Sequence, residues 1–176
     1  MAFALDPKTL HTRTTGFIPE VAQIINSMGL GWLLPTLNEI IWRESGANPY
    51  IISVGSDSYD GIMFILPELE KASGHSWTVT KSPVKEELSV GLWQMNLGGG
   101  MGNTATGYDP KTGNKQSLIG AILSLADPIG STVYVASDIK AGLDTYQKAG
   151  LSPASAAKQV LKPWSTAGAA LSEVPI

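Results

Sequence analysis

The chain contains no cysteine among its 176 residues. This absence excludes disulfide bonds, catalytic thiols and thiolate metal sites, and it says nothing about the redox compartment in which the protein works. Only two histidines are present, His11 and His75, and no metal-ligand residues cluster around either of them. A zinc centre and a Ser/His/Asp triad are therefore poor interpretations, and we expect surface or structural roles for both histidines. The sequence predicts no metal site and no cofactor.

Clusters of charge and long apolar runs are also missing. The 12 basic and 15 acidic residues give a formal charge of -3, and no Lys/Arg cluster offers a surface for nucleic acid or an anionic membrane. No apolar run approaches the ~18 residues that cross a bilayer, and the first residues lack the pattern of a cleavable secretion signal. We therefore expect one soluble globular domain over residues 1–176, without a nucleic-acid partner or a membrane span.

Apolar residues spaced three and four apart predict several helices, whose ends carry Pro, Asp, Ser or Gly. YIISV and IMFIL, on either side of GSDSYDG, read instead as the two strands of a hairpin, and WTVT (Trp77–Thr80) reads as a third short strand. The sequence thus predicts an α+β domain, predominantly helical, with a small β-hairpin or short sheet. The predicted helices begin at Pro19, at about Trp32, at Lys115, at Pro128 behind an Asp127 N-cap, and after Ser152-Pro153.

Glu44 ends the second of these helices, where an apolar face makes a carboxylate unexpected. It follows Leu37, Ile40 and Ile41 by seven, four and three positions, so it lies on their face of the helix. The negative helix terminus and partial burial both disfavour the charged form of such a group. A general acid needs this property, because its carboxyl group must stay protonated until it meets the leaving group. The alternative is that the helix frays after Arg43 and that Glu44 only hydrogen-bonds the next loop.

A second segment, SVGLWQMN (Ser89–Asn96), follows ESGANP (Glu44–Pro49) after an insert of about 40 residues. In spacing and order, the two segments resemble the linked motifs of lytic transglycosylase and goose-type lysozyme domains in the lysozyme-like superfamily. The later segments DPIGSTVYVASDIKAGLDTYQKAG and KPWST look like the end of the same family's pattern. The resemblance covers about Leu34 to Ala170. It implies a lysozyme-like fold in which the small hairpin or sheet forms one wall of the cleft.

Carried over residue by residue, the resemblance implies that Glu44 is the catalytic acid/base and that Ser45 and Gly46 shape the turn that presents it. Asn and Gln amides suit a glycan site, because they donate and accept hydrogen bonds to sugar hydroxyl and N-acetyl groups. Trp93 is equally compatible with a sugar platform and with a core plug, and GLWQMN alone reads as an apolar turn. The substrate-binding residues implied are Ser45, Ser89, Gly91, Leu92, Trp93, Gln94 and Asn96.

A second carboxylate, if the reaction uses one, is expected from the insert. Glu87 precedes the second motif, and Asp57 and Asp60 are expected on the hairpin loop, although each is also compatible with solvated surface. The run Gly98–Gly102 lacks the Gly-Lys-Ser/Thr of a phosphate loop, so we interpret it as a flexible connection.

The implied reaction is cleavage of the β-1,4 bond between N-acetylmuramic acid and N-acetylglucosamine in peptidoglycan. Glu44 acting alone implies a lytic transglycosylase that forms 1,6-anhydro ends, whereas a facing carboxylate implies a hydrolysing muramidase. The expected partners are peptidoglycan glycan strands and other proteins of a bacteriophage virion. The expected location is that virion, or the periplasm and cell wall of the bacterial host. The rival hypothesis is a non-catalytic phage structural or glycan-binding domain with the same fold.

Overall fold

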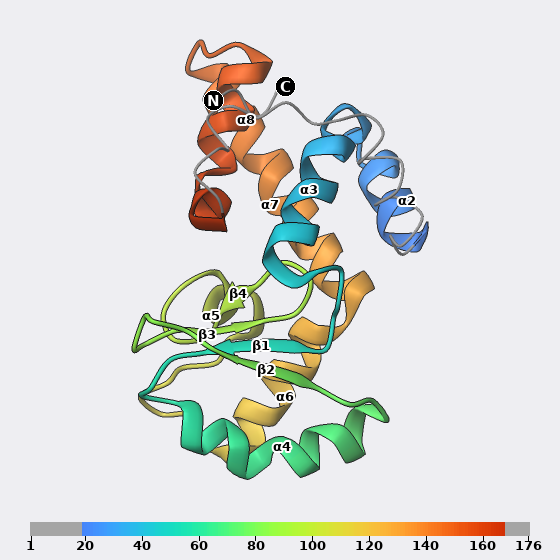
Figure 1. The fold of residues 1–176 in the computed structure, drawn as a ribbon. Coiled ribbons are helices and arrows are strands. Elements are labelled where there is room, and N and C mark those ends of the chain that lie inside the picture. Colours follow the sequence, from blue (N-terminus) through green and yellow to red (C-terminus); the bar gives the residue numbers. More distant parts are fainter. Residues whose placement is uncertain (1–18, 168–176) are drawn as a thin grey trace. The chain divides into compact units, whose positions relative to one another are not determined.

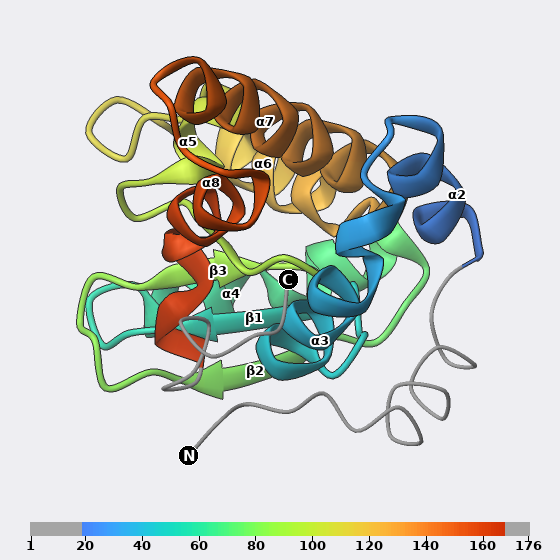
Figure 2. The ribbon, with the colours of Figure 1, turned by 90° about the horizontal axis from the view of Figure 1, so that it is seen from above.

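The computed structural model describes residues 19–167, which divide into two compact units (Figures 1 and 2). Together they form an α+β protein that is mostly helical and has one small mixed sheet, so the predicted fold class is confirmed at this level. Within the described range, no single helix is long and apolar enough to cross a membrane. Only one bent pair, α6 (Lys115–Ala126) and α7 (Pro128–Lys148), reaches the required length and composition when both are counted.

The described part of the first unit, residues 19–47 and 132–167, is built from helices. Its buried side chains recur at helical spacing, with Val21 and Ile25 on its first helix and Leu37 and Ile41 on the next long one. Its elements are α2 (Pro19–Ser27), η1 (Gly31–Leu33), α3 (Leu34–Ser45), α7 (Pro128–Lys148) from Thr132 onward, α8 (Pro153–Val160) and η2 (Lys162–Ala167).

Local capping explains why the later helices begin where the sequence predicts. Asp127 Oδ1 accepts a hydrogen bond from the Ile129 backbone nitrogen at 3.1 Å, directly before α7. Ser152 Oγ accepts one from the Ser155 nitrogen at 3.2 Å, at the start of α8. Each side chain satisfies a backbone donor that a helix start otherwise leaves without a partner. Both predicted helix starts are confirmed.

The second unit, residues 48–131, contains the sheet. The strand order is β2-β1-β3-β4, so β1 lies between β2 and β3, as Figure 2 shows. β1 pairs in parallel with β2 and antiparallel with β3, and β3 pairs antiparallel with β4. Its elements are β1 (Ile51–Val54), α4 (Tyr59–Ser73), β2 (Thr78–Lys81), β3 (Leu88–Val90), β4 (Met95–Asn96), α5 (Met101–Thr106) and α6 (Lys115–Ala126).

The prediction that IMFIL forms a strand is wrong, because this segment lies inside helix α4. Ile62, Ile65 and Leu69 are buried, whereas Phe64 is 74% exposed. This spacing of three and four places one apolar stripe on a helix, while a strand would have put Ile62 and Phe64 on the same face. The β-branched and aromatic composition of the segment favoured a strand locally, and packing against the sheet selects the helix instead.

The hairpin expected around GSDSYDG is therefore also wrong, and α4 acts as the crossover between two parallel strands. Parallel pairing of β1 with β2 needs such a connection, whereas a hairpin would have made them antiparallel. WTVT does contribute a strand, because its last three residues belong to β2. Asp57 and Asp60 consequently do not sit on a hairpin loop. Asp57 lies in the turn before α4, and Asp60 lies in the first turn of that helix.

Candidate functional site

Glu44 lies in the last turn of α3 and is partly buried. The helix continues through Ser45, so it does not fray after Arg43. The Ser45 hydroxyl donates a hydrogen bond to the Ile41 carbonyl oxygen, one helical turn back, at 2.8 Å, so this buried hydroxyl has a partner on its own helix. Glu44 is thus held on regular helix at the negative end of α3, one residue before the chain turns away.

The chain leaves α3 through two successive residues in the left-handed region. Gly46 has φ 61° and caps the helix by donating from its backbone nitrogen to the Trp42 carbonyl oxygen at 3.0 Å. Ala47 also has φ 61°, which is uncommon for a residue with a side chain. Strain of this kind costs about 1 kcal/mol or more and is often kept at functional sites. The turn that follows Glu44 is therefore defined by a strained backbone.

Two polar residues on α3, Asn38 and Glu39, were not singled out from the sequence. Both are buried, and Arg43 Nε lies 3.0 Å from Glu39 Oε1, one helical turn away. The Asn38 side-chain amide has no hydrogen-bond partner within the described residues. The sequence did contain a signal for their burial, because this polar pair lies inside the apolar run LNEIIW. A helix that is apolar on most sides is usually buried all round, so its polar residues are buried with it.

The second motif forms the β3–β4 hairpin and its turn. Ser89 pairs directly with Asn96, and Val90 pairs with Met95, so the motif folds back on itself. The turn begins at Gly91, whose φ is 82°. A side chain at Gly91 would place its first carbon 2.4 Å from the Leu125 carbonyl oxygen of α6, so only glycine fits there.

Gln94 closes this turn. Its backbone nitrogen and its side-chain Nε2 both donate to the Gly91 carbonyl oxygen, at 3.2 and 3.0 Å. Gln94 has φ 48°, a second uncommon left-handed conformation for a non-glycine residue. Its Oε1 makes no hydrogen bond to any residue in the range 19–167, so an acceptor remains on this partly exposed side chain.

Asn96 fixes the other end of the hairpin. Its Oδ1 accepts hydrogen bonds from the backbone nitrogens of Leu88 at 3.0 Å and Gly98 at 2.8 Å. Two of the four glycines that follow are closely packed: a first side-chain carbon at Gly98 would lie 2.0 Å from the Glu86 carbonyl oxygen, and one at Gly102 would lie 2.6 Å from that of Asn96. The interpretation of Gly98–Gly102 as a flexible connection therefore misses the packing that these two glycines provide.

The motif residues differ in exposure. Gly91 is buried, as are Leu92 and Trp93, which are 2% and 1% exposed. Gln94 and Asn96 are partly exposed. Trp93 is therefore enclosed rather than displayed on the surface, and the two partly exposed polar side chains of the motif are the amides of Gln94 and Asn96.

The three candidate second carboxylates all belong to the second unit. The Ser82 hydroxyl donates to Glu87 Oε2, so this carboxylate is engaged within its own unit. Asp57 is exposed, and its backbone nitrogen donates to the Lys85 carbonyl oxygen at 3.1 Å. Asp60 is exposed as well. Glu87 is thus distinguished from the two aspartates, because it is partly buried and accepts a hydrogen bond.

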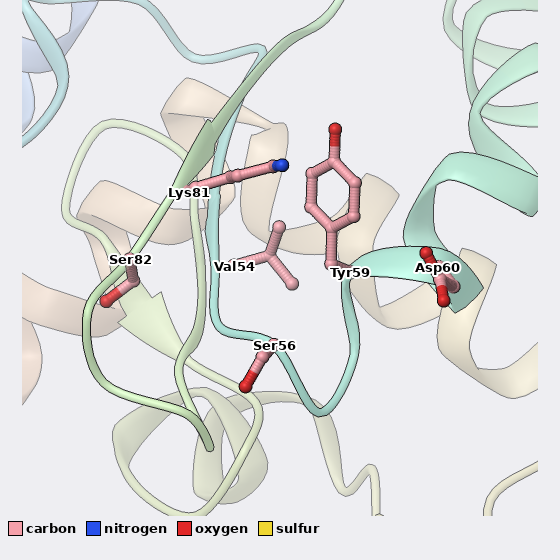
Figure 3. Close-up of a pocket in the computed structure, with 6 residues that line it drawn as sticks. All are labelled: Val54, Ser56, Tyr59, Asp60, Lys81 and Ser82. Atoms are coloured by element: carbon pink, nitrogen blue, oxygen red, sulfur yellow. The ribbon is translucent and has the colours of Figure 1, made fainter.

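A cavity of about 270 Å³ opens at the ends of β1 and β2, where α4 begins (Figure 3). Lys81 extends across Val54 toward Tyr59, and its Nζ lies 4.5 Å from the centre of the Tyr59 ring. Such cation–π contacts stabilise by about 0.5 to 1 kcal/mol at exposed sites. Asp60 lies on the far side of Tyr59 from Lys81 in this view. The lining residues are Val54, Ser56, Tyr59, Asp60, Lys81 and Ser82.

His75, the histidine within the described residues, packs against an aromatic ring. The His75 ring stacks on Tyr50, with ring centres 4.0 Å apart, and Tyr50 meets Trp77 edge-on at 5.5 Å. His11 lies outside the described residues. Between residues 19 and 167, no group of three or more His, Asp and Glu side chains is arranged to hold a metal ion.

No protein-family model, no curated protein and no solved structure matches this chain.

Proposed function

We propose that this protein cleaves the β-1,4 bond between N-acetylmuramic acid and N-acetylglucosamine in peptidoglycan, with Glu44 as the general acid/base. The observation that carries the proposal is the pair of motifs, ESGANP and SVGLWQMN, in their order and spacing. The proposal includes a lysozyme-like fold as the finer description of the α+β architecture. It also includes an association with bacteriophage, because the motifs resemble those of phage-associated wall-degrading domains.

The position of Glu44 supports a role in proton transfer. A carboxyl group at the C-terminal end of a helix faces the negative end of the helix dipole, and partial burial adds a desolvation cost to its charged form. Both effects favour the protonated group that must donate to the glycosidic oxygen. After bond cleavage the same group, now charged, can accept a proton from water or from the muramoyl 6-hydroxyl.

The second motif supports the choice of substrate. Gln94 Oε1 and the amide nitrogen of Asn96 make no hydrogen bond within residues 19–167. One is an acceptor and the other a donor, which matches the hydroxyl and acetamido groups of an N-acetylated sugar. Their other amide atoms bind backbone groups, so both side chains are held in place before a ligand arrives.

Loss of turbidity of a purified peptidoglycan suspension tests the proposal. Wild-type protein should clear the suspension, and Glu44→Gln should clear it at least ~100-fold more slowly, because the change keeps the shape of the side chain and removes the titrating group. Glu20→Gln, at an exposed acid of α2, is the matched control and should behave as wild type. Near-normal clearing by folded Glu44→Gln overturns the assignment, and failure of wild type to clear favours the non-catalytic rival.

A further inference from the structure

A line of polar side chains crosses all four strands of the sheet. In the strand register, Thr80 pairs with Ser53, Ser53 pairs with Ser89, and Ser89 pairs with Asn96. Directly paired residues point their side chains to the same face of a sheet, so these four form one row. With neighbouring strands ~4.8 Å apart, the row is about 14 Å long. We call Thr80, Ser53, Ser89 and Asn96 the polar row.

The opposite face of the same sheet belongs to the core. Side chains alternate along each strand, so the neighbours of the polar row point the other way. On β1, β3 and β4 those neighbours are apolar, and each is at most 4% exposed. On the edge strand β2, Thr80 lies between half-buried Val79 and exposed Lys81. Packing of the core therefore does not require a polar residue at the same level of every strand. Removing these hydroxyl and amide groups from water costs free energy unless they form hydrogen bonds. The buried neighbours are Ile52, Val54, Leu88, Val90 and Met95.

Two members of the polar row are bonded to each other and keep acceptor capacity. Ser53 Oγ and Thr80 Oγ1 lie 3.1 Å apart, and Thr80 Oγ1 lies 3.4 Å from the Ile52 carbonyl oxygen. When Thr80 donates to that carbonyl group, Ser53 must donate to Thr80, because each hydroxyl has one proton. The lone pairs of Ser53 then face a ligand as acceptors.

The other two members keep donors. Ser89 is only 5% exposed, yet its hydroxyl makes no hydrogen bond to any residue of the described range. Asn96 uses Oδ1 for two backbone nitrogens, which leaves both protons of its amide nitrogen for another partner. Asn38 alone among the described residues has fully buried side-chain polar atoms without a partner, so the Ser89 hydroxyl still reaches solvent and can donate to a ligand group.

We propose that the polar row binds the hydroxyl and acetamido groups of an extended polysaccharide that runs across the strands, and that Ser53 and Thr80 are glycan-binding residues beyond the second motif. The row contains hydroxyl and amide groups and no charge, so it suits sugar hydroxyl and acetamido groups rather than phosphate or carboxylate. It is continuous with Ser89 and Asn96, which belong to the motif. This inference rests on the proposed function, because peptidoglycan supplies the polysaccharide.

Binding of peptide-free glycan fragments of two, four and six sugars tests the polar row. The measurements are made by calorimetry in the Glu44→Gln protein, so that the fragments stay intact. Ser53→Ala and Thr80→Val should each raise the Kd of the four- and six-sugar fragments by about threefold to tenfold, the effect of one lost hydrogen bond. The Kd of the disaccharide should not change, because Ser89 and Asn96 still hold it. Ser124→Ala and Thr104→Val, which remove exposed helix hydroxyls, are the matched controls.

The two failures are distinguishable. If the variants and the controls bind every fragment equally while wild type still clears peptidoglycan, the polar row is overturned and the proposed function stands. The same holds if Kd rises equally for all fragment lengths in step with a fall in Tm, because that is the result of a purely structural hydrogen bond. If folded Glu44→Gln binds no fragment and wild type clears no peptidoglycan, both proposals are overturned.

Discussion

The side-chain nitrogen of Gln94 lies 3.0 Å from the carbonyl oxygen of Gly91, so a residue implied to bind glycan also closes the turn that carries it. Only Nε2 takes part in this contact, and Oε1 stays available as an acceptor. The backbone of Gln94 meanwhile holds a left-handed conformation, with φ 48°, that glycine adopts more easily. The structural and binding roles of Gln94 can therefore be separated by choosing the replacement.

Gln94→Ala and Gln94→Gly should lose the same activity and differ in stability. Both remove the amide, so each should weaken catalysis on glycan by ~1 to 3 kcal/mol. Gln94→Ala also loses the contact to Gly91 and keeps the strained backbone, whereas Gln94→Gly relieves a strain of about 1 kcal/mol and should stay close to wild type in Tm. Rates of wall clearing and thermal unfolding of both variants provide the comparison. If activity follows Tm across the pair, Gln94 has only a structural role.

Ala47→Gly should raise the free energy of unfolding and lower the rate of peptidoglycan clearing. Glycine adopts the φ of 61° at this position without the steric cost that alanine carries, which should add up to about 1 kcal/mol to the free energy of unfolding. The same change loosens the turn after Glu44, so the rate of clearing should fall even as Tm rises. Chemical denaturation and the clearing assay measure the two effects. A variant that gains stability with full activity shows that the strain at Ala47 does not serve Glu44.

Gly91→Ala should destabilise far more than the same change at Gly107. Both glycines have positive φ, 82° and 73°, so both variants carry backbone strain of about 1 kcal/mol. Only Gly91 faces a backbone oxygen at 2.4 Å, whereas nothing lies within 4 Å of a side chain at Gly107. The collision should add about 1 to 3 kcal/mol, measured as the difference between the two free energies of unfolding. Equal values would mean that the β3–β4 turn shifts freely away from α6.

Sequence reasoning succeeded where the determinants of structure are local. The starts of α7 and α8 depend on Asp127 and Ser152, each of which caps a helix through a residue two or three positions away. It failed for α4, because the choice between strand and helix for IMFIL depends on packing against distant residues. Parallel pairing of β1 with β2 has no local signal either, since partners such as Ile51 and Thr78 are far apart in sequence.

In the candidate site, too, features set by local sequence were predicted and features set by long-range packing were not. Helical periodicity placed Glu44 on the side of Ile41 at the end of α3, and its partial burial agrees with that placement. The burial of Trp93 could not be read from the sequence, because a tryptophan in a turn serves equally well as a platform or as a plug. The polar row could not be predicted from the sequence either, because only the strand register brings together Thr80, Ser53 and Ser89 from three separate segments.

The nature of the product depends on whether a second carboxylate takes part. Glu87 receives a hydrogen bond from Ser82, which orients it within its own unit, while Asp57 and Asp60 are exposed. None of the three combines partial burial with a place at a helix terminus, as Glu44 does. We therefore expect catalysis by Glu44 alone, with 1,6-anhydro ends on the released glycan.

Glu87→Gln, Asp57→Asn and Asp60→Asn should each keep activity within about tenfold of wild type. A loss of ~1.4 kcal/mol covers a missing orienting contact, whereas removal of a catalytic base or nucleophile costs much more. Glu87→Gln should cause the largest of the three small effects, because only Glu87 is engaged by a described hydroxyl, that of Ser82. Rates of clearing test the substitutions, and mass spectrometry of the wild-type digest identifies the glycan ends. One substitution that abolishes clearing, together with reducing ends in that digest, would instead establish a muramidase with two carboxylates, because hydrolysis requires a group that positions or replaces water opposite Glu44.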